Sequence, residues 1–174
     1  MNRNVQQFRQ QKDEYMKFSP QSPIPHDERS AFQGLEYYDY NEALALRLPA
    51  SEFDDKEEIE MQTSTGDLRN YLRWGEINFE VDGKPARLTL YYSPAHGHFF
   101  LPFMDATSGT ETYGAGRYLD PEMVDDGVFE VDFNMAYSPF CAYNPAYSCP
   151  IPPAENRLKV PIEAGEKLLE SHQA

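Results

Sequence analysis

The first residues of the chain carry an apolar stripe at helical spacing. Its apolar members are Val5, Phe8, Tyr15 and Met16. The polar Lys12 interrupts the row, so the pattern predicts a helix over residues 4–17 with one thin apolar face. Prolines in the segment 18–25 then break the helix. The acidic residues that follow Pro25 favour the start of a short second helix.

After Gly34 the period of the apolar positions falls from about four to two, as in half-buried β-strands. Alternation predicts strands near residues 44–48, 59–63, 68–74, 77–81, 86–90, 99–103, 111–119 and 128–134. The pair Asp82-Gly83 is a strong signal for a two-residue hairpin. Turns are also expected at 94–97, 107–109 and 125–127. The short connections favour antiparallel neighbours.

These elements predict a mainly β (α+β) fold. We expect an antiparallel meander curled into a barrel or sandwich, with an N-terminal helix and a long Pro-rich C-terminal segment. The length of 174 residues favours a single domain over residues 1–174. Within it we expect a helical N-terminal segment (1–34), a β body (41–134) and a C-terminal segment (135–166) that wraps over the body.

The charge of the chain narrows the choice of partners. It has 15 Lys+Arg against 29 Asp+Glu, a formal net charge of −14. Nucleic acids and anionic membranes attract positive surfaces, so neither is an expected partner.

No apolar run approaches the roughly 20 residues of a membrane helix, and residues 1–12 lack the apolar centre of a signal peptide. We therefore expect a soluble, cytoplasmic protein. Exposed strand edges are compatible with a homodimer.

Two redox states are possible for the two cysteines, Cys141 and Cys149. In a reducing cytoplasm they are expected to remain thiols. A disulfide closing the seven residues between them is also feasible and would constrain the unfolded chain.

The most informative cluster of polar residues falls on the predicted strands 111–119 and 128–134. Side chains alternate between the two faces of a strand. If Leu119 pairs with Val128, one face of this hairpin is apolar. The other face then carries Tyr113, Arg117, Glu130, Asp132 and Asn134. On an open surface these groups would form only a cross-strand ion pair worth about 0.5 kcal/mol.

The C-terminal segment (135–166) bears on this interpretation, because a long segment without periodicity is expected to pack over the β body. If it folds over the polar face, Tyr137, Cys141, Tyr143 and Asn144 cover a lined pocket. We predict that this pocket binds a small polar or anionic molecule. Arg117 would hold the anionic group, and the ligand would be oriented by Tyr113, Asp132, Asn134, Tyr137 and Tyr143.

Several motifs of the chain resemble a known family. They are FMDATSG at 103–109, TYGAGRYL at 112–119, DFNMAY at 132–137, PFCAYN at 139–144, CPIPP at 149–153 and IEAGE at 162–166. Together they resemble domain-of-unknown-function family 1684, found in bacteria and some archaea. The resemblance implies that Arg117, Asp132, Asn134, Cys141 and Tyr143 belong to the family pattern. It supplies no reaction.

Two other functions remain open beside binding. A hydrolase or transferase would use Asp132 as a base or Cys141 as a nucleophile. A structural or interaction domain would use the same motifs only to close the fold. The pair His96-x-His98 has the minimum spacing for a metal but no evident third ligand, so no metal site is predicted. The sequence names no cofactor.

Overall fold

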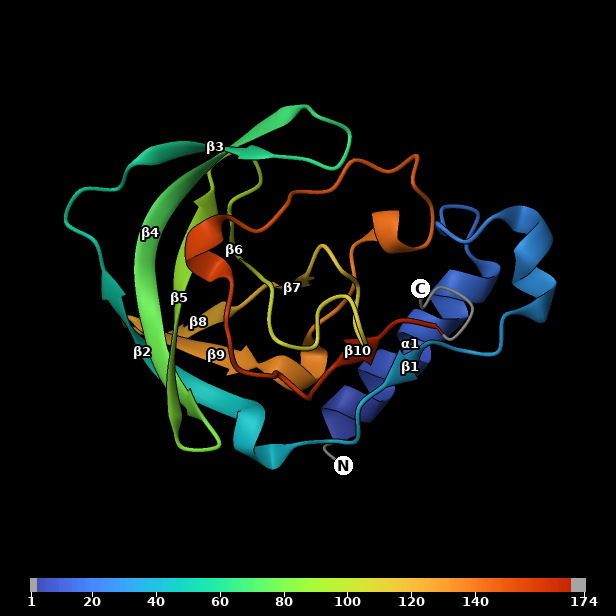
Figure 1. The fold of residues 1–174 in the computed structure, drawn as a ribbon, viewed down its shortest axis with the longest axis horizontal. Coiled ribbons are helices and arrows are strands. Elements are labelled where there is room, and N and C mark those ends of the chain that lie inside the picture. The colour runs from blue at the N-terminus through green and yellow to red at the C-terminus, as the bar shows by residue number, and fades with distance from the viewer. Residues whose placement is uncertain (1–2, 170–174) are drawn as a thin grey trace.

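The computed structural model describes residues 3–169 and has a mainly β architecture with an N-terminal α-helix (Figure 1). Helix α1 spans Arg3–Phe18, close to the predicted range. Its buried residues are Val5, Arg9 and Met16, which lie on one side of the helix. The predicted amphipathic helix is therefore confirmed, although one of its buried positions is an arginine.

The β-strands account for most of the remaining regular structure. They are β1 (Glu36–Tyr37), β2 (Ala45–Glu52), β3 (Glu58–Gln62), β4 (Leu68–Val81), β5 (Lys84–Ser93), β6 (His98–Phe103), β7 (Arg117–Leu119), β8 (Glu122–Asp125), β9 (Val128–Asp132) and β10 (Glu166–Lys167). Short 3-10 helices span His26–Ala31, Glu42–Leu44, Phe133–Met135, Phe140–Ala142 and Ala154–Asn156. The first of these lies where the second helix was predicted.

The large sheet is antiparallel, with strand order β7-β6-β5-β4-β2-β9-β8. It curves into a half-barrel rather than a closed barrel (Figure 1). On one side, the long strand β4 pairs with β3 through Leu68–Leu72 and then with β2 through Gly75–Ile77. On its other side, its pairing with β5 shifts register between Arg73 and Gly75. A Cβ at Gly75 would lie only 2.6 Å from the carbonyl oxygen of Ser51. Glycine therefore permits the close contact between β4 and β2.

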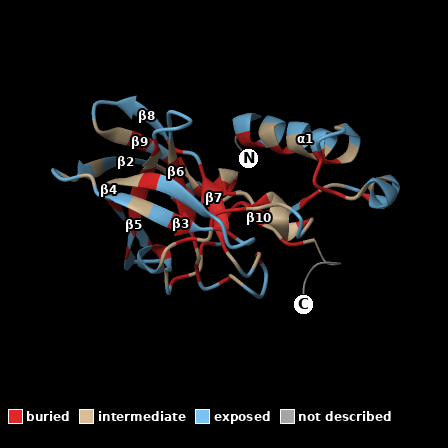
Figure 2. Cartoon of the chain, turned by 90° about the horizontal axis from the view of Figure 1, so that it is seen from above, coloured by how far each residue is buried: buried red, intermediate tan, exposed pale blue. Residues whose placement is uncertain are grey.

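The hairpin between β4 and β5 confirms the prediction made from Asp82-Gly83. Both turn residues have positive φ, 50° and 80°, as a type I′ turn requires. Val81 and Lys84 form the last pair before the turn, and Ile77 lies opposite Leu88. The buried residues collect in the centre of the β body, while β8 and the outer side of α1 are exposed (Figure 2).

The predicted hairpin of 111–119 with 128–134 is wrong. Strand β7 pairs with β6, where Leu119 lies opposite Leu101. Strand β9 pairs with β2 and β8, and its Glu130 lies opposite Arg47 and Glu122 instead of Arg117. The sheet is therefore not a simple meander.

Local backbone chemistry explains why residues 111–116 do not form a strand. Thr107 and Thr112 lie 3.0 Å apart between their hydroxyl oxygens and close a tight loop. Gly116 has a φ of 97°, which ends any extended run before Arg117. The sequence of this segment does alternate between apolar and polar residues, but the segment forms a loop and not a strand.

No helix within residues 3–169 has the length and apolarity needed to cross a membrane.

Candidate functional site

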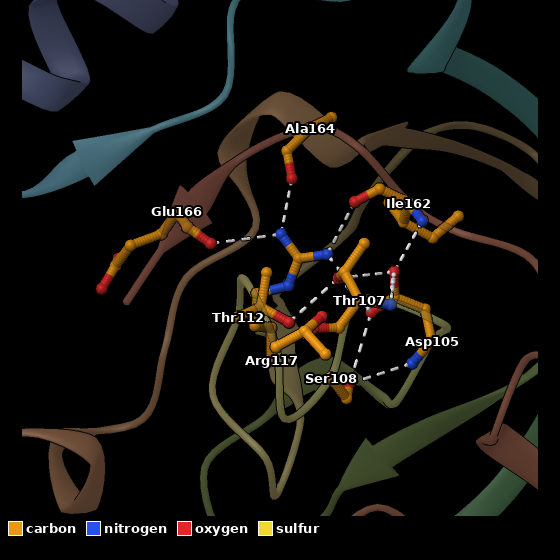
Figure 3. A network of polar contacts seen from close by, with 9 residues as sticks. Asp105, Thr107, Ser108, Thr112, Arg117, Ile162, Ala164 and Glu166 are labelled. Carbon is orange, nitrogen blue, oxygen red and sulfur yellow. Dashed lines mark hydrogen bonds and ion pairs between the residues drawn. The ribbon is translucent and has the colours of Figure 1, made fainter. Parts of the chain in front are cut away.

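Arg117, the predicted anion-binding residue, is fully buried, and Figure 3 shows the polar groups that surround its guanidinium. Its Nη1 donates to the carbonyl oxygens of Ala164 (2.5 Å) and Glu166 (3.2 Å). Its Nη2 donates to the carbonyl oxygen of Ile162 (2.9 Å) and lies 3.5 Å from Asp105 Oδ1. The guanidinium therefore binds the chain's own C-terminal segment. The expectation that Arg117 contacts a ligand is corrected, because the side chain has no exposed surface.

Asp105 completes this buried network. Its carboxylate accepts hydrogen bonds from the Thr107 hydroxyl and from the Ile162 amide, the latter at 2.6 Å. Burial lowers the pKa of Arg117, and the Asp105 carboxylate opposes that shift by favouring the charged form. The network holds residues 162–166 against the loop that precedes β7.

Asn134 and Asp132 also make bonds within the fold. The side-chain oxygen of Asn134 accepts a hydrogen bond from the backbone N–H of Asn41, and the side-chain nitrogen of Asn134 donates to the backbone carbonyl of Asn41, each at 2.9 Å. Asp132 Oδ1 accepts from the backbone and side-chain nitrogens of Asn134. Asn134 is buried, so it is not placed to bind a ligand as predicted. Asp132 is only partly buried and lines a cavity.

Tyr143 belongs to a third buried group. Its hydroxyl donates to the carboxylate of Glu166, which also receives Lys12 Nζ at 2.6 Å. Burial raises the pKa of Tyr143, and the negative charge of Glu166 raises it further. These contacts attach α1 and the segment around Tyr143 to β10. Tyr143 also lines a further cavity, beside Ile24 and Phe32, away from Arg117's network, so its predicted ligand contact stays a prediction.

Cys141 and Tyr113, both predicted site residues, contact each other, and neither bonds to Arg117. The Cys141 thiol donates to the Tyr113 hydroxyl oxygen at 3.5 Å. Both residues are partly buried, and both cysteines of the chain are free thiols.

Tyr137 separates two cavities. Its hydroxyl donates to Asp120 Oδ2 at 2.6 Å, and both residues line both cavities. The first, here called the acidic cavity, has a volume of about 370 Å³ and lies between α1 and the strands β8 and β9. It is lined by carboxylates and apolar side chains, including Asp120, Glu122, Glu130, Asp132, Val5, Phe8 and Met135. Of the predicted site residues, Asp132 and Tyr137 meet here.

The second cavity, here called the aromatic cavity, has a volume of about 470 Å³ and is formed mainly by β4, β5, β6 and β7. Phe100 stacks on Tyr71 with ring centroids 5.3 Å apart and meets Tyr118 edge to face at 4.8 Å. Tyr118 in turn meets Tyr137 edge to face at 5.8 Å. Its basic lining residues are Arg69, His96 and His98.

The sequence contained a signal for this second cavity. Arg69 and Tyr71 are two residues apart on β4, as are His98 and Phe100 on β6, so each strand presents a basic and an aromatic side chain on one face. Ser93 of β5 lies opposite His98 and also lines the cavity. Within residues 3–169, no group of three or more His, Cys, Asp or Glu side chains is arranged to hold a metal ion.

Comparison with known proteins places the chain in a family. The family model described as "Protein of unknown function (DUF1684)" matches residues 30–167, and the chain belongs to this family. Its structure is similar to the solution NMR structure of an uncharacterised protein from the archaeon Haloarcula marismortui. The two chains share 36% identity and a TM-score of 0.72, covering 94% of this chain and 92% of the other. No curated protein matches the chain.

Proposed function

We propose that the aromatic cavity binds a small organic anion that carries a ring. The observation that supports this proposal is the presence of Arg69, His96 and His98 around an aromatic wall. In a chain with a net charge of −14, such a gathering of basic side chains is a local exception. The cavity volume of about 470 Å³ is in the range of small-molecule sites.

Arg69 is the residue best suited to hold the charged group. Its Nη2 donates to the Ser148 carbonyl oxygen at 2.6 Å, which fixes the direction of the guanidinium. Arginine has five N–H donors in one plane, so a single internal bond leaves others for a carboxylate or phosphate. His96 and His98 are exposed and add ring N–H donors nearby.

The opposite wall suits the rest of the ligand. Tyr71, Phe100 and Tyr118 are buried against one another and line the cavity, where they can make apolar and edge contacts with a ligand ring. Asp120, held by the Tyr137 hydroxyl, can accept a hydrogen bond from a hydroxyl or amino group of the ligand. The charge of Arg69 and the acceptor of Asp120 would together orient the molecule.

This proposal keeps the predicted ligand class but replaces the residues that bind it. Tyr137 is retained, and Arg69 takes the role that the sequence analysis gave to Arg117. Neither Asp132 nor Cys141 lines the aromatic cavity, so the proposed function is binding and includes no reaction.

Four small probes test the proposal by separating charge from ring. Benzoate has both, acetate has only the charge, benzyl alcohol has only the ring, and benzylamine has the opposite charge. In an amide NMR titration, we expect benzoate to shift residues 69–71, 93–100 and 118 most strongly. Acetate and benzyl alcohol should bind more weakly, because each lacks one kind of contact.

Two pairs of variants make the test specific. Arg69→Ala and His98→Ala should weaken benzoate binding, with Arg69→Ala costing at least about tenfold because a charge-assisted hydrogen bond is worth about 1.5–3 kcal/mol. The matched controls Arg87→Ala and His26→Ala change exposed residues outside the cavity and should leave binding unchanged. The proposal fails if benzoate shifts none of these amides, or if benzylamine binds more tightly and shifts the acidic cavity instead.

A further inference from the structure

The two cysteines lie close together in space, although seven residues separate them in the chain. The backbone N–H of Cys141 donates to Cys149 Sγ at 3.4 Å. Cys141 lies in the 3-10 helix Phe140–Ala142, and Cys149 lies just before the point where Pro150 bridges to Thr63. Both are free thiols.

The surrounding contacts hold Cys149 in place. Its N–H donates to the Ser64 hydroxyl at 3.1 Å, and its carbonyl oxygen accepts from the Ser64 N–H at 2.9 Å. These two bonds attach Cys149 to the turn after β3. Cys141 is positioned by its own bonds to Cys149 and Tyr113. The fold therefore keeps two sulfur atoms close without a covalent link.

The two thiols differ in access and in acidity. Cys141 is partly exposed, whereas Cys149 is buried. A hydrogen bond from the Cys149 thiol lowers the pKa of Cys141 to about 6, although burial opposes this shift. The same bond and burial raise the pKa of Cys149. Cys141 is therefore suited to attack an oxidant, and the position of Cys149 beside it lets this second thiol resolve the product.

We propose that Cys141 and Cys149 are a redox modification site, at which a peroxide converts the two thiols into an intramolecular disulfide. This inference is independent of the proposed ligand. The two sites are nevertheless neighbours, because Pro150 follows Cys149 and lines the aromatic cavity.

The reaction proceeds in two steps. The Cys141 thiolate attacks one oxygen of hydrogen peroxide; an S–O bond forms, the O–O bond breaks, and hydroxide leaves and takes a proton from solvent to become water. Cys149 then attacks the sulfur of the Cys141 sulfenic acid; an S–S bond forms, and the S–O bond breaks. The departing hydroxide combines with the Cys149 proton as water. Overall, two thiols are oxidised by two electrons and one peroxide is reduced to two waters.

Intact-mass measurement of the full chain tests this inference directly. After treatment with one equivalent of hydrogen peroxide, we expect the monomer to lose two hydrogens, and peptide mapping should join the segments that contain Cys141 and Cys149. Dithiothreitol should restore the original mass. A gain of oxygen without a disulfide, or a disulfide between two chains, would overturn the proposal.

Single substitutions then separate the roles of the two thiols. Cys149→Ala should stop at the sulfenic acid, which dimedone traps at Cys141. Cys141→Ala should react much more slowly, because it keeps only the buried thiol. In the unmodified chain, alkylation of Cys141 by iodoacetamide should rise around pH 6, and Cys149→Ala should move this rise to higher pH. Equal peroxide reactivity of the two variants would contradict the assignment.

Discussion

Replacing Arg117 by methionine tests whether this residue holds the fold together. Methionine keeps a long apolar side chain in the buried space but removes the guanidinium. The carbonyl oxygens of Ile162, Ala164 and Glu166 then lose their hydrogen-bond donor, and Asp105 loses its ion-pair partner. Arg117→Met therefore leaves several acceptors buried without a partner.

The expected cost is large for a single substitution. Removing one partner of a buried ion pair costs about 3–5 kcal/mol, because the remaining charge stays buried. Loss of the carbonyl contacts favours the upper part of this range. For a chain of this length, each kcal/mol lowers the melting temperature by about 2–4 °C, so Arg117→Met should lower it by about 6–20 °C.

Urea unfolding measures the free-energy change, and hydrogen exchange shows where it arises. We expect faster exchange in residues 160–168, which the guanidinium holds. The control Arg47→Met changes an exposed residue of β2 and should stay within about 0.5 kcal/mol of the unmodified chain. A loss below about 1 kcal/mol for Arg117→Met, or unchanged exchange in 160–168, would refute this reasoning.

Two further predictions concern residues near the end of the chain. The buried side-chain amide of Asn156 accepts from the backbone N–H of Thr89 and donates to the carbonyl oxygens of Thr89 and Pro102. Asn156→Ala should therefore lower the free energy of unfolding in urea by about 2–4 kcal/mol. A decrease of less than about 1 kcal/mol would argue against this role. Burial raises the pKa of Glu155, but its bonds to Arg73 and a tyrosine hydroxyl outweigh this and leave the pKa below its usual value. Glu155→Gln should therefore cost about 1 kcal/mol at neutral pH, and the difference should disappear as the pH falls through the pKa of Glu155; a difference independent of pH would contradict the shift.

Much of the fold could be predicted from local patterns. The helix and most strands follow from spacings within a few residues, and Asp82-Gly83 specifies its turn because both positions need positive φ. The pairing of β9 with β2 was missed because β2 lies about 80 residues earlier in the chain, and its pairing with β8 was missed because the short, exposed β8 shows no apolar alternation. Periodicity shows which face a side chain takes, but it does not show which strand lies beside it.

The candidate site illustrates the same limit. Arg117 was predicted to hold a ligand because its actual partners are carbonyl oxygens of residues 162–166, and any residue type supplies a carbonyl. By contrast, Arg69, Tyr71, His98 and Phe100 were within reach of sequence reasoning. The β4–β5 and β5–β6 hairpins were predicted, and they bring these four side chains to neighbouring strands.

The strand order of the half-barrel begins at β7 and ends at β8, and the chain treats these two edges differently. Beside β7, Tyr118 and Tyr137 exchange backbone hydrogen bonds of 2.8 and 3.0 Å, so the C-terminal segment occupies that edge. At the other end β8 is exposed along its length and carries Glu122 and Asp125. A second copy adding its own β8 there would bring like charges together. These charges disfavour growth of the sheet through two β8 edges, although the apolar side chains of Met123 and Val124 are also exposed there.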